Sequence, residues 1–267
     1  MPTSLSIASG KGGVGKTTLA INLAIMQAKN SNCLLLDADM GMANAHILLG
    51  INPDLTIKDF FDGNYSLEKV ITEGPEKLKF ISGGSGITEM LNIDKNKKLN
   101  FIRSFDQLSG KIDNLIVDVS AGAEDSSLSL LSASDKVLIV LVNEPTIFTD
   151  AFTLIKACHL EFGLREFCLA VNMANNEKHG NEVYLKFNKV MRKFYDVNIT
   201  FVGSIPKNNK IQKSVIQKKP LILDKTNKDF YFLFDKMISN INKAPENKFE
   251  GIRFFNNSLV NKNGSHL

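Results

Sequence analysis

The sequence predicts an α/β fold with three layers, in which helices flank a mostly parallel sheet. Strand-like apolar runs alternate with helical patterns along most of the chain, and this alternation is typical of parallel strands joined by crossover helices. A glycine-rich loop joins the first of these strands to the first helix. Two later apolar runs end in aspartates, which suits a sheet whose strand ends face a ligand.

The expected elements follow one another in a single domain. Short apolar runs predict strands at residues 5–9, 33–37, 78–82, 114–118, 136–142, 167–171 and 200–204. Apolar residues at helical spacing predict helices at residues 17–29, 97–108, 125–132, 148–161, 182–194 and 228–242. No linker, internal repeat or low-complexity block interrupts residues 1–242, whereas residues 243–267 are rich in Asn, Gly and Lys and are expected to form a tail.

Length and composition fit a globular domain with a sizeable core. The chain has 267 residues, of which 43% are hydrophobic and 22% charged. No run approaches the roughly 18 apolar residues of a membrane span. The first strand follows the N-terminus without a basic segment, so no signal peptide is expected and the expected location is the cytoplasm. Cys33, Cys158 and Cys168 lie far apart in apolar contexts, which predicts buried thiols and neither disulfides nor a metal site.

The net charge of +4 is distributed unevenly along the chain. From Lys207 to Leu267 there are twelve lysines and arginines against five acidic residues, a surplus of +7 that leaves −3 for the rest. A basic end on a nearly neutral body suggests an anionic partner, which is either a membrane surface or a nucleic acid.

The glycine-rich loop between the first strand and the first helix carries a phosphate-binding motif. Gly10, Gly15, Lys16 and Thr17 fit the spacing G-x-x-x-x-G-K-[ST] in the strand–loop–helix context that the motif requires. Glycines let backbone N–H groups curl around phosphate oxygens. Lys16 is expected to reach the β- and γ-phosphates, and the Thr17 hydroxyl to ligate Mg²⁺. The residues expected to bind the nucleotide here are Gly10, Lys11, Gly12, Gly13, Val14, Gly15, Lys16, Thr17 and Thr18.

The same loop contains a second lysine, Lys11, although Lys16 already serves the phosphates. The pattern K-G-G-V-G-K-T-T, with both lysines, resembles the deviant Walker A box of the MinD/ParA family. The resemblance implies a P-loop NTPase fold over residues 1–242 and a homodimer that forms on ATP, in which Lys11 reaches the nucleotide of the partner subunit. The alternative is that Lys11 is an ordinary solvated lysine.

The second strand ends in Asp37, and Asp39 follows two residues later. Because side chains alternate along a strand, both carboxylates are expected to point the same way, toward the ligand crevice. The next residues, 40–50, resemble switch I of MinD-type proteins and are closer still to the flagellar-number regulators of FlhG/FleN type. By that resemblance Asp39 orients the attacking water, with Lys11 and Lys16 as further catalytic residues, and Asp37 supports the Mg²⁺. The alternative is that one of the two acids caps a short helix.

The predicted strand at residues 114–118 ends in Asp118, which matches a Walker B aspartate. Such an aspartate would hold Mg²⁺ through its water ligands. Residues 119–125 follow as the switch II candidate, with Gly122 as a hinge. Relatives usually read D-S-P-A-G or D-T-G-A-G, whereas this chain has D-V-S-A-G.

Recognition of the base is expected at two further strand ends. Asn172 lies where an asparagine of the family hydrogen-bonds adenine, although an asparagine there can also be a simple turn residue. Pro206 belongs to a segment that resembles the family's cover for the other side of the ring. Relatives commonly have an acid soon after this proline, whereas Lys207 follows here. Because residues 172–175 lack the N-K-x-D guanine box, ATP with Mg²⁺ is the expected cofactor.

The resemblance covers roughly residues 5–224, and residues 59–68, 81–86 and 144–152 favour the FlhG branch over the MinD branch. It implies a slow, Mg²⁺-dependent ATPase switch that dimerises on ATP and controls the placement or number of a cellular structure, with flagella as the expected structure. The implied partners are an SRP-type GTPase and flagellar switch components. FlhG-type proteins usually carry an N-terminal helix that stimulates that GTPase, and the four residues before the expected first strand are too few to form it, so stimulation is not expected.

Two other functions remain open. One is a DNA-binding partition ATPase of ParA type, whose basic C-terminal third would hold duplex DNA, and the other is a division-site regulator of MinD type. A scaffold that holds nucleotide without meaningful turnover is a third and weaker possibility.

The tail contains a candidate amphipathic helix at residues 248–262. Its apolar residues at helical spacing are Phe249, Ile252, Phe255 and Leu259, with basic residues beside them. The segment resembles the C-terminal helix by which MinD-type proteins hold membranes, so a reversible, peripheral location on the inner face of the cell membrane is expected. The alternative is packing against the domain, because Gly251 and three asparagines are poor helix formers.

Overall fold

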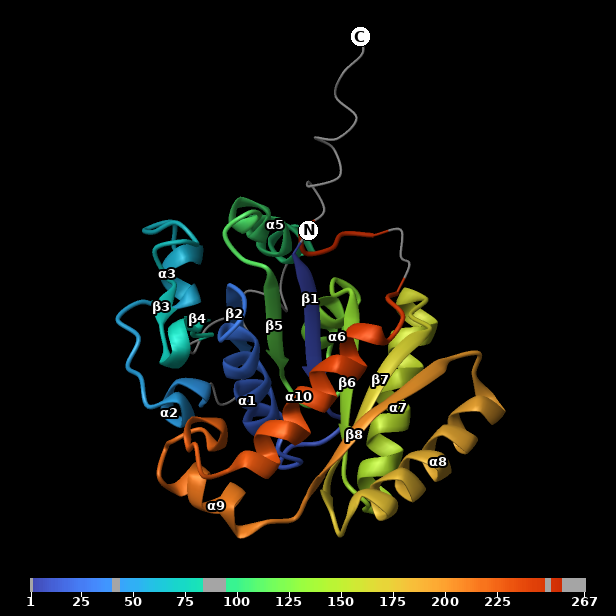
Figure 1. Ribbon diagram of the computed structural model, residues 1–267. Coiled ribbons are helices and arrows are strands. Elements are labelled where there is room, and N and C mark those ends of the chain that lie inside the picture. The colour runs from blue at the N-terminus through green and yellow to red at the C-terminus, as the bar shows by residue number, and fades with distance from the viewer. Residues whose placement is uncertain (1, 40–43, 84–94, 248–250, 256–267) are drawn as a thin grey trace.

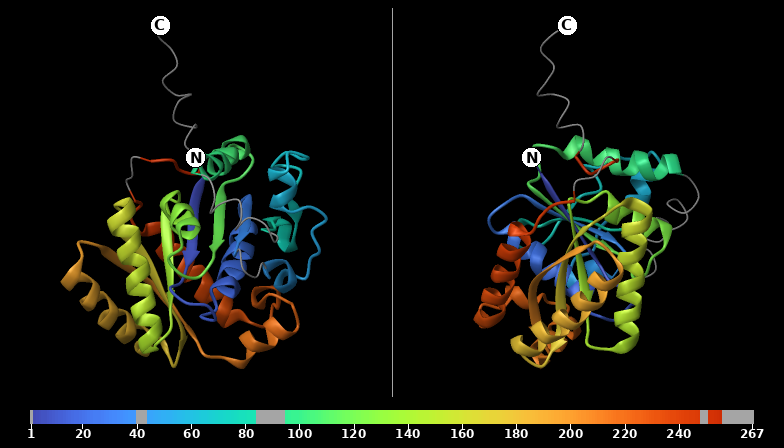
Figure 2. Two further views of the ribbon diagram at one scale, coloured as in Figure 1. Left: turned by 180° about the vertical axis from the view of Figure 1, so that it is seen from behind. Right: turned by 90° about the vertical axis from the view of Figure 1, so that its right-hand side faces the viewer.

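The computed structural model describes residues 2–39, 44–83, 95–247 and 251–255. Its strands form one sheet in the order β3-β4-β2-β5-β1-β6-β7-β8 (Figure 1). Neighbouring strands are parallel except for the antiparallel pair of β3 and β4. Helices α1 and α10 cover one face of the sheet, and α6 and α7 cover the other (Figure 2). The predicted α/β fold with a mostly parallel sheet is therefore confirmed.

The strands are β1 (Thr3–Ala8), β2 (Cys33–Ala38), β3 (Thr72–Glu73), β4 (Lys79–Ile81), β5 (Asn114–Val119), β6 (Lys136–Leu141), β7 (Glu166–Ala174) and β8 (Asn198–Pro206). The helices are α1 (Lys16–Ala28), α2 (Ala45–Leu49), α3 (Ile57–Phe61), α5 (Lys95–Ser104), α6 (Asp125–Ser132), α7 (Pro145–Phe162), α8 (Glu177–Phe194), α9 (Asn209–Ile216) and α10 (Lys228–Lys243). The described residues also form short 3₁₀ turns, which are η1 (Pro75–Lys77), η2 (Phe105–Leu108) and η3 (Leu221–Leu223).

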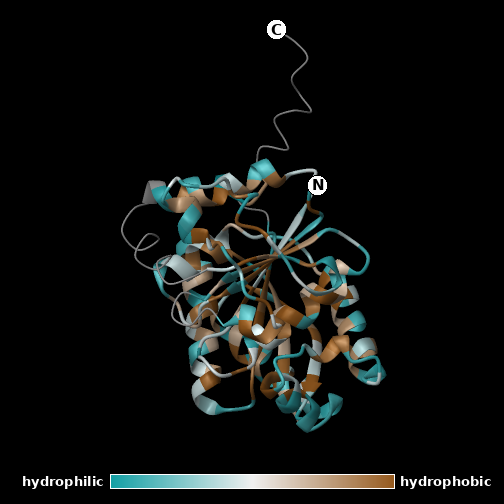
Figure 3. Cartoon of the chain, turned by 90° about the vertical axis from the view of Figure 1, so that its left-hand side faces the viewer, coloured by the Kyte–Doolittle hydropathy of each residue, from teal (hydrophilic) through white to brown (hydrophobic). Residues whose placement is uncertain are grey.

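The core lies on both faces of the central strands. All six residues of β2 and of β6 are buried, because helices cover both sides of a parallel sheet and its strands are then continuous apolar runs. Figure 3 shows hydrophobic residues concentrated on these strands and on the inner faces of the helices. Because parallel strands share one direction, their carboxyl ends meet at a single edge, and the predicted site residues follow those ends.

The tail departs from the expected helix. Residues 251–255 are not helical, and Phe255 has a φ of 63°, which a right-handed helix cannot contain. The N–H of Phe254 donates to the Ala133 carbonyl at 3.0 Å, and Phe255 is only 4% exposed. The prediction of a helix across residues 248–262 is therefore wrong for the part that the structure describes.

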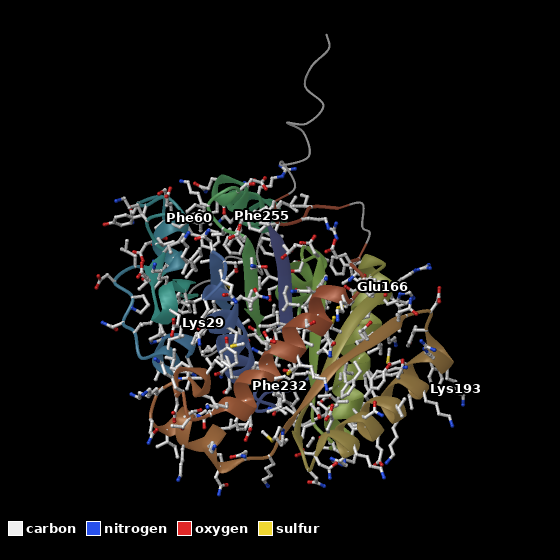
Figure 4. All side chains as sticks on the ribbon, in the orientation of Figure 1. Lys29, Phe60, Glu166, Lys193, Phe232 and Phe255 are labelled. Atoms are coloured by element: carbon white, nitrogen blue, oxygen red, sulfur yellow. The ribbon has the colours of Figure 1, made fainter. Side chains whose placement is uncertain are left out.

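A row of phenylalanines explains why this segment packs on the domain. The rings follow one another from α3 through α5 and η2 to the tail, in the order Phe60, Phe61, Phe101, Phe105, Phe254 and Phe255 (Figure 4 labels both ends of the row). Phe254 meets Phe105 edge to face at 5.1 Å between centroids, a favourable aromatic geometry. The domain thus offers the tail an apolar site of its own.

The other tail residues predicted to face lipid are placed differently. Ile252 is half-buried, and Phe249 and Leu259 lie outside the described residues. Among the helices of the described part of the chain, none combines the length and the apolar character needed to cross a membrane.

Because the tail packs on the domain, we expect that removing a buried tail side chain lowers the free energy of unfolding substantially. Phe254→Ala is expected to lower the free energy of unfolding by about 3–5 kcal/mol, because it leaves a cavity beside Phe105. Urea denaturation would measure the change. The control is Phe232→Ala on α10, where the ring is 72% exposed and the expected change stays within about 0.5 kcal/mol. Equal effects of the two substitutions would show that the tail is not part of the folded core.

Candidate functional site

The glycine-rich loop, residues 10–18, leads from the end of β1 into α1. Gly15 is the N-cap of α1 and has a left-handed backbone, with a φ of 86°. The Ser9 hydroxyl donates to the Lys11 carbonyl at 2.9 Å, and the Gly122 N–H donates to the Ser9 carbonyl at 2.9 Å. The loop is therefore tied at its start to the segment predicted as switch II.

Two glycines of the motif are required because neighbouring groups leave no room for a side chain. A Cβ atom on Gly10 would overlap the backbone of Asp150 and Ala151 in α7. A Cβ atom on Gly15 would overlap the Nδ2 atom of Asn172, at the end of β7. The loop is thus packed against both α7 and β7, which explains the glycine spacing in steric terms.

A cluster of one lysine and two aspartates lies below the loop. Lys16 is buried at the start of α1, and its Nζ donates to Asp118 Oδ1 at 2.6 Å. The same Nζ lies 3.6 Å from Asp39 Oδ2. Asp118 is fully buried at the end of β5, whereas Asp39, after β2, is 28% exposed. The topology therefore brings together three of the residues predicted to act on the nucleotide.

Asp37 lies deeper than Asp39 and makes different contacts. Its carboxylate accepts the N–H of Ala45, the first residue of α2, at 3.1 Å and the N–H of Asp39 at 3.2 Å. Asp37 lies directly opposite Asp118 in the pairing of β2 and β5. Burial, together with the negative charge of Asp118, raises the pKa of Asp37 to about 7. Asp37 therefore holds the start of α2, the capping role that was the alternative for one of the two acids.

The donors near the loop suit a cation that arrives with a nucleotide. Burial raises the pKa of Asp118, an effect partly offset by the charge of Lys16. Asp118 Oδ2 is buried and lacks a hydrogen-bond partner among the described residues. No group of three or more His, Cys, Asp or Glu side chains in the described ranges could hold a metal alone. Mg²⁺ commonly keeps several waters and binds through one or two protein ligands and the phosphates, so the residues present fit it.

A cavity of about 420 Å³ opens beside the loop. It is lined by Gly15, Thr18, Asn172, Met173, Pro206, Lys207, Asn208, Ile211, Gln212, Val215 and Ile216. The first helical turn of α1 forms one wall and α9 the other. The cavity is apolar for most of its surface, which suits the flat ring of a nucleobase. Asn172 and Pro206, predicted to contact the base, both lie on its wall.

Helix α9, which forms one wall of this cavity, was not predicted from the sequence. Helix α9 is only eight residues long, and its apolar face (Ile211, Val215 and Ile216) supplies much of the lining. Asn208 caps this helix by accepting the N–H of Lys210 at 2.8 Å. The pattern of an asparagine followed by apolar residues at positions 211, 215 and 216 is the signal that could have identified α9.

Comparison with known proteins agrees with this geometry. A family model described as "ParA: NUBPL iron-transfer P-loop NTPase" matches residues 1–242. The chain is 36% identical to the antiactivator FleN of Pseudomonas aeruginosa over 216 residues, which are 80% of this chain and 77% of FleN. It is 29% identical to the flagellum site-determining protein YlxH of Helicobacter pylori, over 81% of this chain and 74% of YlxH.

Among solved structures, the fold is similar to that of the septum site-determining protein MinD of Pyrococcus horikoshii, complexed with Mg-ADP. The TM-score is 0.73 at 23% sequence identity, and the match covers 91% of this chain and 97% of that one. This likeness concerns the fold.

Proposed function

The chain belongs to the ParA/MinD family of P-loop NTPases, and from that premise we propose that it is an ATP-dependent dimerising switch that controls the number or placement of flagella. The observation that carries the proposal is the contact of Lys16 with Asp118 and Asp39 beneath a glycine loop that also carries Lys11. This combination supplies a phosphate site, a cation site and a carboxylate near the expected position of the attacking water.

Each residue of the site has a separate role in the proposed binding and hydrolysis of ATP. Lys16 leaves Asp118 when a triphosphate enters, because the phosphates offer more negative charge. Asp118 and the Thr17 hydroxyl would hold Mg²⁺, which would neutralise charge that develops on the phosphate oxygens. Asp39, the most exposed of the three acids at the site, orients the water. Lys11 is exposed at the rim of the loop and reaches the nucleotide of a second copy.

Flagella are proposed because of the relatives. FleN is named an antiactivator and YlxH a flagellum site-determining protein, and both match about four-fifths of this chain. An SRP-type GTPase and flagellar switch components are the proposed protein partners. The test is to delete the gene and count flagella per cell. Cells with an unchanged number and position of flagella would exclude this part of the proposal.

The biochemical part is tested with the purified full chain. Light scattering should report a monomer with Mg-ADP and a dimer with a slowly hydrolysed ATP analogue. Phosphate release from Mg-ATP should be slow and should require Mg²⁺. A chain that hydrolyses no ATP and has the same mass in both nucleotide states would contradict the proposal.

Asp39→Ala is expected to lower ATP turnover about 100-fold, because positioning of the reacting water is lost. Nucleotide affinity should change little, since Lys16 and Asp118 remain. Single-turnover hydrolysis and nucleotide titration would separate the two effects. Asp54→Ala, which removes an exposed aspartate outside the site, is the control. Wild-type turnover in Asp39→Ala would assign the water to another residue.

A reversible peripheral location on the cytoplasmic face of the membrane belongs to the same proposal. Because Phe254 and Phe255 are buried, membrane binding through this segment requires their release from the domain. The test is co-sedimentation with anionic liposomes, with ATP and with ADP, for the full chain, a chain ending at Asn247, and Phe255→Glu. Equal binding by all three proteins, or none with ATP, would remove the tail from the membrane model.

One observation favours a second candidate, a DNA-binding partition ATPase. Five exposed lysines surround α9, and no acidic residue lies among them in residues 207–219: Lys207, Lys210, Lys213, Lys218 and Lys219. Such a surface suits the phosphates of a duplex. Retention on non-specific duplex DNA should then fall steeply with salt. The absence of retention at low salt would exclude this candidate.

A further inference from the structure

Helix α9 forms a wall of the cavity beside the glycine-rich loop, yet none of its own residues is buried. Its contact with the hydrophobic core is made by Ile211, which is half-buried. A helix with so few buried apolar contacts is held weakly by its own side chains. The position of α9 therefore depends on the segments to which it is joined.

The C-terminal end of α9 is joined closely to the turn η3. The N–H groups of Lys218 and Lys219 donate to carbonyls in the last turn of α9, at 3.1 and 3.0 Å. Pro220, whose ring restricts φ, then leads directly into η3. Because this connection is short and is bonded back onto α9, a displacement of η3 would also move α9.

Two buried asparagines hold η3 in place. Leu221 and Ile222 of this turn are buried, so their backbone groups need hydrogen-bond partners inside the protein. The Ile222 N–H donates to Asn22 Oδ1 at 3.0 Å. Asn227 Nδ2 donates to the Leu221 carbonyl at 3.1 Å. Asn22 lies in α1, and Asn227 is the N-cap of α10, so η3 is fixed to both helices.

Asn22 connects this support to the nucleotide site. Its Nδ2 donates to the Thr18 carbonyl at 2.7 Å, and Thr18 lines the same cavity as α9. Asn22 and Ile222 lie 200 positions apart in the sequence. One amide thus bridges the two walls of the cavity, which are the start of α1 and the segment that carries α9.

We infer that Asn22 and Asn227 are positioning residues that hold α9, through η3, as the wall against which the base is bound. The inference rests on the proposed nucleotide site, in which this cavity receives the base. Neither asparagine lines the cavity, so both act on the base through α9. Binding of the phosphates depends on the glycine-rich loop and Lys16, and it should not depend on α9.

The experiment compares a ligand that has a base with one that has none. Competition against a fluorescent ATP analogue, with the purified full chain, gives the affinities of ATP and inorganic tripolyphosphate, each with Mg²⁺. Asn22→Ala and Asn227→Ala should each weaken ATP about tenfold, as expected for one lost buried hydrogen bond, and leave tripolyphosphate within about twofold of wild type. Wild-type ATP affinity in both variants, or an equal loss for the two ligands, would overturn the inference.

A matched control separates positioning from a general loss of stability. Asn240→Ala, in α10, also removes a side-chain donor to a backbone carbonyl, that of Val202 in β8 at 3.0 Å. Neither residue lines the cavity beside the loop. This variant should lose stability in urea but keep the wild-type affinity for both ligands. If Asn240→Ala weakened ATP as much as Asn22→Ala does, the effect would not come from α9 and the inference would be wrong.

Trypsin provides a second measurement, which needs no nucleotide. Lys210 and Lys213 of α9 are exposed, and cleavage beside them requires local opening of the helix. Cleavage there should be about tenfold faster in Asn22→Ala and Asn227→Ala and unchanged in Asn240→Ala. Wild-type cleavage rates in both variants would overturn the inference. A wild-type chain that binds neither ATP nor tripolyphosphate would overturn the proposed function, and the trypsin result would still show whether the asparagines hold α9.

Discussion

Lys16→Ala is expected to weaken nucleotide binding by about 100-fold or more. Removing one partner of a buried, hydrogen-bonded charge pair costs about 2–5 kcal/mol in binding, and 1.4 kcal/mol corresponds to a factor of ten. The loss should be large here, because the variant lacks the buried cation that lies beside Asp118 and Asp39 beneath the loop. Titration of the purified variant with Mg-ATP would measure the effect, and an affinity within a few-fold of wild type would contradict the assigned role.

The same substitution should also affect folding in the absence of nucleotide. Without Lys16, Asp118 stays buried without its 2.6 Å partner, and breaking such a pair costs about 3–5 kcal/mol. Lys16→Ala combined with Asp118→Asn removes the uncompensated charge. The double variant should regain most of the stability in urea but none of the nucleotide affinity. Recovery of binding in the double variant would show that Lys16 acts only on the fold.

The central sheet and the phosphate loop were predictable because their signals are local. The strands β2, β5 and β6 each contain a continuous apolar run, and the motif from Gly10 to Thr17 is read within one short segment. Lys16 and Asp118 lie 102 positions apart in the sequence. Their proximity was still predictable, because parallel strands bring their carboxyl ends to one edge of the sheet.

The parts that were not predicted depend on contacts without a local signal. Asn172 reaches Val14 across 158 positions, and no pattern around either residue indicates this hydrogen bond. Helix α2 has five residues, too few for a clear periodicity. In the tail, the apolar spacing was real, but its outcome depends on Phe105, which lies in a different part of the chain. Burial against an existing aromatic row therefore decides the conformation there.

Lys11→Ala is expected to abolish the ATP-dependent dimer and to leave the affinity of the monomer for nucleotide within about threefold of wild type. The Lys11 side chain is exposed, and in the part of the chain that the structure describes no acidic group forms an ion pair with it. The hydrogen bond that Lys11 makes to another of the described residues is through its backbone: its carbonyl accepts the Ser9 hydroxyl. A charged side chain without an ion pair in its own subunit is available for the phosphates of another.

The effect on the dimer should be large because each interface would lose two such contacts by symmetry. At about 1.5–3 kcal/mol for each hydrogen bond to a charged group, two losses weaken dimerisation by roughly 10²- to 10⁴-fold. Light scattering with a slowly hydrolysed ATP analogue is the measurement. Lys193→Ala makes the same change of charge on the exposed surface of α8 and should dimerise like wild type. If Lys11→Ala still forms the dimer at micromolar concentration, the nucleotides do not lie between two copies of the chain.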